Sequence, residues 1–283
     1  MQLEEKMRTA LTAEGEELWN IVRDPHPAVI LNASLNKHLS EDMAVFISKK
    51  RSTPAEVLGM LAADIRFKDS YKLKLAICKN PKTPQKITLS LLKFLRIFDL
   101  GDMTKEQLIP ISIRQKIEYS ISEKMASLPS GTKTALAKRS NSNIVVSLLE
   151  KGDKNVIAAC LESPSITEGH LCKLINRLSS KPLLIRMIAE NQKWSLRYDI
   201  RFALIRNFQT PMKYAVEFIN SIKTSDLREL YSYGNLPTAT KPFIYRELMD
   251  RNETVEPPKE ELYELSEDEE ADIDEIISNQ DDS

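Results

Sequence analysis

The amino-acid sequence predicts an all-α fold, an α-solenoid of short stacked helices, on three observations. Gly is scarce, with 7 residues in a chain of 283, whereas residues that favour helices are abundant. Short apolar runs at helical spacing are separated by turns that carry Asn, Ser or Pro. The chain also repeats itself at a fixed offset. Because short apolar helices bury their faces only against neighbours, we expect about ten to fourteen helices and no sheet.

Thr-Pro pairs mark three expected helix starts, at Thr53-Pro54, Thr83-Pro84 and Thr210-Pro211. Each pair precedes an apolar run at helical spacing. Thr is expected to supply the N-cap oxygen, and Pro to occupy the first helical position, where its fixed φ is already suitable. Each cap would stabilise its helix by about 1 kcal/mol. Further N-caps are expected at Ser40, Ser142, Thr167, Asp99 and Asp226.

The second and third Thr-Pro pairs lie 127 residues apart, and the match continues without gaps on both sides. Apolar character is kept at most of the paired positions. The aligned pairs include Phe67 with Trp194, Tyr71 with Tyr198, Ala76 with Ala203, Asn80 with Asn207, Asp99 with Asp226, and Pro110 with Pro237. We interpret residues 9–125 and 136–252 as a tandem duplication. The predicted segments are a first helical unit at 1–130, a second at 131–252, and an acidic tail at 253–283.

The repeated pattern resembles a known family. The stretch from Ala76 to Leu92 reads Ala-x-x-x-Asn-Pro-x-Thr-Pro-x-x-x-x-x-x-Leu-Leu. It resembles the bacterial leucine-rich repeat variant and the broader HEAT-like helical repeats, over most of residues 20–252. The resemblance implies stacked helices and no particular activity. Some proteins with the variant repeat carry an amino-terminal cysteine cluster for an iron–sulfur centre, which this chain lacks, so that feature does not carry over.

The net charge of −1 hides two opposite charges. Residues 253–283 contain 14 acidic residues and one basic residue, a net charge of −13. The remaining body contains 39 Lys and Arg against 27 Asp and Glu, a net charge of +12. A tail of this composition cannot bury enough apolar surface to order itself, so we expect it to be disordered. It could serve as a solubilising tail, or as a docking peptide or internal competitor that lies on the basic body.

The sequence offers no catalytic, cofactor or metal signature. Phosphate-binding glycine loops and nucleophile motifs are absent, and we expect neither a small-molecule substrate nor an enzyme. His26, His38 and His170 have no second ligand at a convincing spacing. The three cysteines match no zinc or redox motif and are expected to be buried apolar residues in a reducing, cytoplasmic setting. No apolar run approaches the length that a membrane span needs.

One segment, Lys193 to Arg201, interleaves aromatic residues with arginines. Trp194, Arg197 and Arg201 could form a patch that stacks bases or grips an acidic peptide. Alternatively, the aromatic rings pack between helices and the arginines face solvent. Phe67 and Tyr71 at the equivalent positions favour packing.

Six positions are basic in both copies, and a solenoid would place repeated charges in a row along one surface. For some of these residues, stabilisation of a helix C-terminus is the simpler role. The six pairs are Lys74 and Arg201, Lys79 and Arg206, Lys86 and Lys213, Arg96 and Lys223, Arg114 and Lys241, and Lys124 and Arg251. The candidate partner-binding residues are Lys74, Lys86, Arg114, Trp194, Arg197, Arg201, Lys213 and Lys241.

The sequence therefore favours a non-catalytic scaffold or adaptor that binds a protein partner along an extended helical surface. The alternative is a nucleic-acid-binding helical repeat protein with a basic surface and an acidic autoinhibitory tail. A base-excision glycosylase on a HEAT-like scaffold would need a desolvated acid beside an aromatic pocket, which the sequence does not place.

Overall fold

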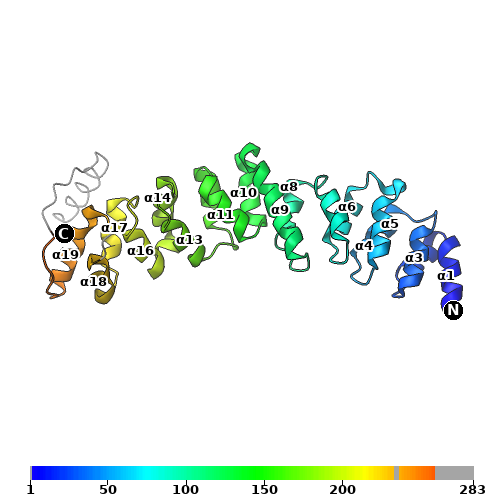
Figure 1. Ribbon diagram of the computed structural model, residues 1–283, viewed down its shortest axis with the longest axis horizontal. Helices are drawn as coiled ribbons and strands as arrows, with labels where there is room; N and C mark the ends of the chain where they lie inside the picture. The colour runs from blue at the N-terminus through cyan, green and yellow to red at the C-terminus, as the bar shows by residue number, and fades with distance from the viewer. Residues whose placement is uncertain (1, 233–235, 259–283) are drawn as a thin grey trace. The chain divides into compact units, whose positions relative to one another are not determined.

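The computed structural model describes residues 2–232 and 236–258, and it is helical throughout (Figure 1). Within these ranges the chain forms nineteen α-helices, three short 3₁₀ helices and no strand, which confirms the all-α prediction. The helices are more numerous than we expected, because turns of a few residues divide the apolar runs. Most of the predicted acidic tail lies outside the described residues.

The first half of the chain contains nine α-helices among its described residues. They are α1 (Leu3–Thr12), α2 (Gly15–Val22), α3 (Pro27–Leu35), α4 (Glu41–Lys49), α5 (Ala55–Ala63), α6 (Tyr71–Lys79), α7 (Gln85–Leu92), α8 (Ile97–Met103) and α9 (Ile111–Lys124), with the 3₁₀ helices η1 (Ile65–Phe67) and η2 (Met125–Ser127).

The second half continues in the same manner. Its helices are α10 (Ser130–Arg139), α11 (Ser142–Lys151), α12 (Lys154–Leu161), α13 (Glu168–Ile175), α14 (Pro182–Glu190), α15 (Gln192–Ser195), α16 (Tyr198–Ile205), α17 (Met212–Ile219), α18 (Thr224–Ser232) and α19 (Lys241–Asp250), with the 3₁₀ helix η3 (Thr238–Thr240).

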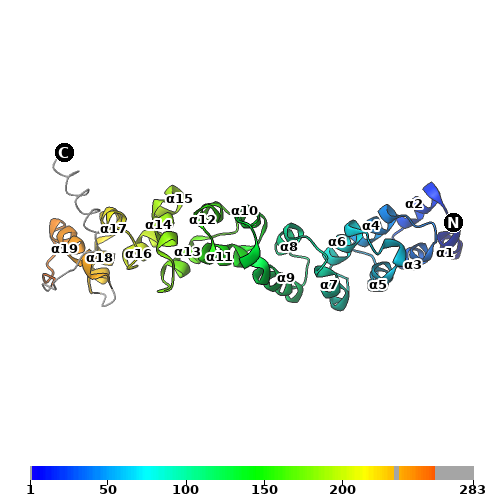
Figure 2. The same cartoon turned by 90° about the horizontal axis from the view of Figure 1, so that it is seen from above.

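The described chain divides into two compact units. The first unit contains residues 2–129 and 139–144, and the second contains residues 130–138 and the described residues from 145 onward. Within each unit, helices pack on their near neighbours in the chain, such as α4 on α6 and α18 on α19 (Figure 2). Leu, Ile, Val and Ala side chains form the buried core between them. The sequence-based segments 1–130 and 131–252 stay predictions.

Helix starts recur at the offset of 127 residues found in the sequence. The helices α3 and α12 begin at Pro27 and Lys154, and α6 and α16 begin at Tyr71 and Tyr198. The bounds of α5 and α14 show the same offset, from Ala55–Ala63 to Pro182–Glu190. The helix positions therefore recur along the chain, although the residues before them differ, as with Ser70 before α6 and Arg197 before α16.

Buried amide side chains connect one helix end to another. Nδ2 of Asn36, which ends α3, donates to the carbonyl oxygens of Ala10 and Ala13, each at 2.9 Å. Nδ2 of Asn80, which ends α6, donates to the carbonyls of Ser48 at 2.8 Å and Lys50 at 3.0 Å. These carbonyls lie at helix C-termini, where no intrahelical N–H is available to them.

Asn207 makes the equivalent contact in the second unit. Its Nδ2 donates to the carbonyl of Ile175, the last residue of α13, at 2.5 Å. Its Oδ1 accepts the backbone N–H of Gln209 at 2.8 Å, as Asn80 accepts that of Lys82 at 3.0 Å. Each amide therefore bonds to the end of an earlier helix, α4 or α13, and to the turn that follows its own helix.

The expected role of the Thr-Pro pairs is wrong in its detail. Pro84 and Pro211 occupy the N-cap positions of α7 and α17, and neither helix has a side-chain cap. The hydroxyls of Thr83 and Thr210 instead donate to the carbonyls of Ile77 and Leu204, each at 2.6 Å. The threonines thus satisfy the end of the preceding helix rather than the start of the next. Thr53 does the same for the carbonyl of Ile47 at 2.6 Å.

The predicted N-caps at Ser40 and Thr167 are confirmed. Ser40 Oγ accepts the N–H of Met43 at 3.3 Å, and Thr167 forms a capping box with His170. Ser142 is the first residue of α11, and the cap is supplied by Asn141, whose Oδ1 accepts the N–H of Ile144 at 3.3 Å.

The expected N-caps at Asp99 and Asp226 are wrong, because both residues lie inside the first turn of their helices. Their carboxylates accept hydrogen bonds from the hydroxyls of Tyr71 and Tyr198. Each tyrosine oxygen in turn accepts a backbone N–H at 3.1 Å, from Arg96 or Lys223. The side chains of these two cations lie over the tyrosine rings, at 4.7 Å for Arg96 and 5.4 Å for Lys223.

The cysteines Cys78 and Cys160 are buried, and Cys172 is half-buried. Burial raises the pKa of the Cys78 and Cys160 thiols to about 12, because the thiolate would lose its hydration. Both thiols are therefore protonated and act as small apolar core residues.

We expect Asn80→Ala to lower the free energy of unfolding by about 1–3 kcal/mol, because two buried carbonyls lose their donor. Asn155→Ala, at an exposed position inside α12, is the matched control and should leave stability unchanged or slightly raised. Urea denaturation followed by circular dichroism measures both variants. Equal stability of the two variants would contradict the role assigned to the Asn80 amide.

We expect the double variant Tyr71→Phe/Tyr198→Phe to lose less stability than the wild type in alkali. Desolvation and the hydrogen bonds to Asp99 and Asp226 raise the pKa of both phenols above the ordinary value of 10.0. The folded state thus holds these protons more tightly, and that stabilisation is lost as the pH rises above about 10. Thermal unfolding between about pH 9 and pH 11 should show a smaller decline for the variant. Parallel declines would show that the two phenols do not contribute.

Candidate functional site

The described residues contain no group of three acidic, His or Cys side chains that could hold a metal ion. The histidines have structural roles: His26 Nδ1 accepts the N–H of Ala28 at 3.3 Å, His38 lies 2.7 Å from Glu14, and His170 caps α13. Among the described helices, none is both long and apolar enough to cross a membrane.

Trp194, one of the predicted partner-binding residues, lies in the core. Its side chain is 5% exposed, and its Nε1–H donates to the carbonyl of Leu161, the last residue of α12, at 2.9 Å. The indole is therefore placed to seal a helix end rather than to stack on a partner. Arg201, also on the predicted patch, turns inward, where its Nε donates to the carbonyl of Ser195 at 2.5 Å. Only Arg197 of the three is exposed.

The other predicted cations are spread over several helices. Lys74 on α6 lies over the ring of Phe94 at 4.9 Å. Lys86 on α7 is exposed, whereas Arg114 on α9, Lys213 on α17 and Lys241 on α19 are half-buried. Arg114 Nε is buried and has no hydrogen-bond partner among the described residues.

The repeated cations do not form one row in the first unit. Lys74 and Lys79 are five residues apart on α6, which places them about 140° apart around the helix axis. Lys74 lines a hollow with Phe94 and Ile65, and Lys79 lines a different hollow with Lys49 and Arg51. The repeated cations Lys74 and Lys79 therefore lie on two different sides of α6, not in the single row that the sequence suggested.

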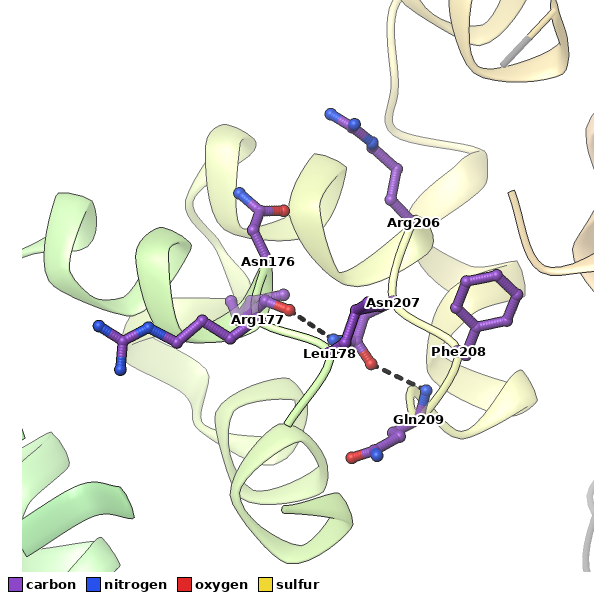
Figure 3. A pocket seen from close by; sticks show the side chains of 8 residues that line it. Asn176, Arg177, Leu178, Arg206, Asn207, Phe208 and Gln209 are labelled. Atoms are coloured by element: carbon purple, nitrogen blue, oxygen red, sulfur yellow. Dashed lines mark hydrogen bonds between the residues drawn. The ribbon is translucent and has the colours of Figure 1, made fainter. Parts of the chain in front are cut away.

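A hollow of about 340 Å³ lies in the second unit, between the turns that follow α13 and α16 (Figure 3). We call it the second-unit hollow, and its lining includes Asn176, Arg177, Leu178, Arg206, Phe208 and Gln209. The Asn207 amide joins the two turns, as the dashed bonds in Figure 3 show. Two apolar side chains at the rim are strongly exposed, Leu178 at 89% and Phe208 at 60%.

A hollow of about 400 Å³ occupies the equivalent place in the first unit. We call it the first-unit hollow. Its apolar lining includes Val45, Leu75, Ala76 and Leu108. Four cations also line it, Lys49, Arg51, Lys72 and Lys79.

Part of the lining of the two hollows corresponds at the offset of 127. Ser48, Lys79 and Asn80 of the first line up with Ile175, Arg206 and Asn207 of the second. In both units the amide that closes the turn, Asn80 or Asn207, also forms part of the wall. The geometry that satisfies helix ends therefore also creates a concave surface, twice.

No pattern in the sequence predicts these hollows. Their walls come from the ends of helices that lie about thirty residues apart, and no contiguous motif marks them. One signal is present in the sequence, the aligned Asn80 and Asn207, each preceded by a cation. Both residues follow the end of a helix, but the surface at such an end depends on the neighbouring helix.

Comparisons with known proteins leave the family open, because no family model, curated protein or solved structure matches the chain. The resemblance to leucine-rich repeat variants and HEAT-like repeats therefore stays a prediction.

We expect Trp194→Ala to lower the free energy of unfolding by about 3–5 kcal/mol, because it removes a buried ring and the donor to Leu161. Arg197→Ala, three residues away and exposed, should change stability by less than about 0.5 kcal/mol. Urea denaturation of both variants distinguishes a packing residue from a surface residue. If Trp194→Ala changes the free energy of unfolding only slightly, Trp194 is again a candidate for partner binding.

Proposed function

We propose that the chain is a non-catalytic helical-repeat scaffold that binds a protein partner at its two hollows. The observation that carries this proposal is the exposed apolar rim of the second-unit hollow. Leu178 and Phe208 are 89% and 60% exposed and lie on the same concave surface. Large apolar side chains that share a concave site are typical anchors for a protein partner.

The architecture in this proposal is an α-solenoid of two tandem copies of one unit of about 127 residues. The recurrence of helix starts supports it, as do paired contacts such as those of Tyr71 with Asp99 and Tyr198 with Asp226. Repeated helical layers provide extended surfaces for binding, and site differences between layers allow one partner to be recognised at several points. Three free cysteines are typical of a reducing compartment, and we expect the protein to act in the cytoplasm.

A photo-crosslinking residue tests the second-unit hollow. We expect p-benzoylphenylalanine in place of Phe208, in the full chain inside its native cells, to capture a discrete protein partner. The matched control is the same residue in place of Leu196, which is 71% exposed and does not line either hollow. Capture is measured by gel shift and mass spectrometry of the purified adducts.

Substitution of the two exposed apolar residues of the second-unit hollow measures how much they contribute to the affinity for the partner. We expect Leu178→Ser/Phe208→Ser to weaken binding of the captured partner by about tenfold or more, because both apolar anchors are lost. Leu196→Ser should leave the affinity unchanged. Equal capture from positions 208 and 196, or capture from neither, would contradict the proposed function.

A further inference from the structure

We infer that the first-unit hollow binds an acidic segment of a partner protein that carries an apolar anchor residue. This inference deepens the proposed function and rests on it, because it names the chemistry of the partner at the other of the two hollows. Three features of the hollow support it, namely its unpaired cations, its apolar lining and a buried hydroxyl group without a partner.

The cations around the first-unit hollow are largely uncompensated. In the described part of the chain, Lys49, Arg51 and Lys72 form no ion pair. Lys79 lies 3.2 Å from Glu106, and both side chains are partly exposed. A concave surface lined by charges of one sign concentrates the electric field and attracts oppositely charged groups. The ligand that complements this rim therefore carries several negative charges.

The apolar lining of the first-unit hollow favours a peptide over a nucleic acid as its ligand. Val45, Leu75 and Ala76 line the hollow together with the cations, and Leu108, also in the lining, is 46% exposed. Proteins that bind single-stranded nucleic acid commonly stack bases on aromatic rings. The described residues that line this hollow include no aromatic side chain. An aliphatic lining under a basic rim instead fits an aliphatic side chain flanked by carboxylates.

Ser48 adds an unsatisfied polar group to the same wall. The residue is 0% exposed, and its Oγ has no hydrogen-bond partner among the described residues. A buried hydroxyl without a partner is unfavourable, and an acceptor on a bound segment would remove that penalty. The equivalent position in the second unit is Ile175, which has no such group.

Comparison of the two hollows shows that the helical frame does not require the positive charge. At the positions of Lys49, Arg51 and Lys72, the second unit has Asn176, Leu178 and Asp199. The helix α13 ends at Ile175, one residue before the position that aligns with Lys49, the last residue of α4. The amides of Asn80 and Asn207 nevertheless donate to equivalent carbonyls, those of Ser48 and Ile175, and close equivalent turns. These shared contacts form without the three cations, and ligand binding explains why the cations are concentrated at the first-unit hollow.

The test measures binding of a defined acidic probe to the full chain. The probe is a short fluorescein-labelled peptide of Asp and Glu around a central Leu-Leu pair, followed by fluorescence anisotropy at low salt. We expect Arg51→Glu/Lys72→Glu to weaken binding by about tenfold or more, because the rim charge is reversed. Lys37→Glu/Lys116→Glu is the matched control, since it makes the same charge change at exposed positions outside the hollow. The control should weaken binding by less than about twofold.

Two further measurements test the apolar lining of the hollow and the role of the Ser48 hydroxyl. A probe with Ser-Ser in place of Leu-Leu should bind more weakly than the original, because the aliphatic anchor is missing. Ser48→Ala should weaken binding by about threefold to tenfold, which corresponds to one hydrogen bond. The same substitution should leave the free protein at least as stable as the wild type in urea. A loss of stability in Ser48→Ala would show that its hydroxyl already has a partner.

Several outcomes would overturn the inference. They are an absence of probe binding, equal weakening by the two charge-reversal pairs, and tighter binding of a single-stranded oligothymidylate with the same dependence on Arg51 and Lys72. The last outcome would assign the hollow to nucleic acid. If the crosslinks from position 208 persist in any of these cases, only the acidic-segment inference fails and the proposed function stands. If the probe binds but those crosslinks are absent, the proposed function fails at the second-unit hollow, and only the affinity of the first-unit hollow for an acidic segment is supported.

Discussion

Helices of eight to ten residues leave a large share of their backbone carbonyls without an intrahelical donor, and this constraint shapes the structure. Each α-helix has four such carbonyls at its C-terminus, so a chain built from short helices accumulates many of them. Water satisfies these groups only at the surface. Where helix ends are buried, side chains from nearby segments have to donate to them.

The chain meets this constraint with several different side chains. Amides donate from Asn36, Asn80 and Asn207, hydroxyls from Thr83 and Thr210, and an indole N–H from Trp194. Lys and Arg side chains, which are longer, also donate to backbone carbonyls at helix ends. Lys50 Nζ donates to the carbonyls of Val22 and Asp24 at 2.9 and 3.0 Å, and Arg251 donates to those of Ile222 and Asn220 at 2.7 and 3.0 Å. Part of the basic charge of the body is therefore structural and unavailable to a partner.

The sequence predicted the features that depend on local composition. The all-α class follows from scarce Gly and the helical spacing of apolar residues, and Ser40 and Thr167 cap helices as expected. The same reasoning failed where a side chain has two possible backbone partners. A Thr before Pro can accept from the following helix or donate to the preceding one, and burial of Thr83 at 9% exposure favours the second.

The candidate site was harder to predict because it depends on distances between helices. Trp194 and Arg201 looked like a surface patch in the sequence, since aromatic and basic residues alternate there. In the structure Trp194 is buried and Arg201 is half-buried, and each donates to a carbonyl at a helix end. Arg51 and Lys72 are exposed around a hollow whose walls come from separate segments.

The two hollows share the Asn amide contact at a helix end, but their surfaces differ. The Asn amide and the turn that it closes are needed in both units, so substitutions there carry a cost in stability. The rim residues carry no such cost, because their side chains are exposed and contribute little to folding. Lys49 and Arg51 in one hollow correspond to Asn176 and Leu178 in the other, and the contacts of Asn80 and Asn207 with the helix ends are equivalent in both. Since stability constrains the frame but not the rim, the rim is the part of each hollow that is free to acquire specificity for a partner.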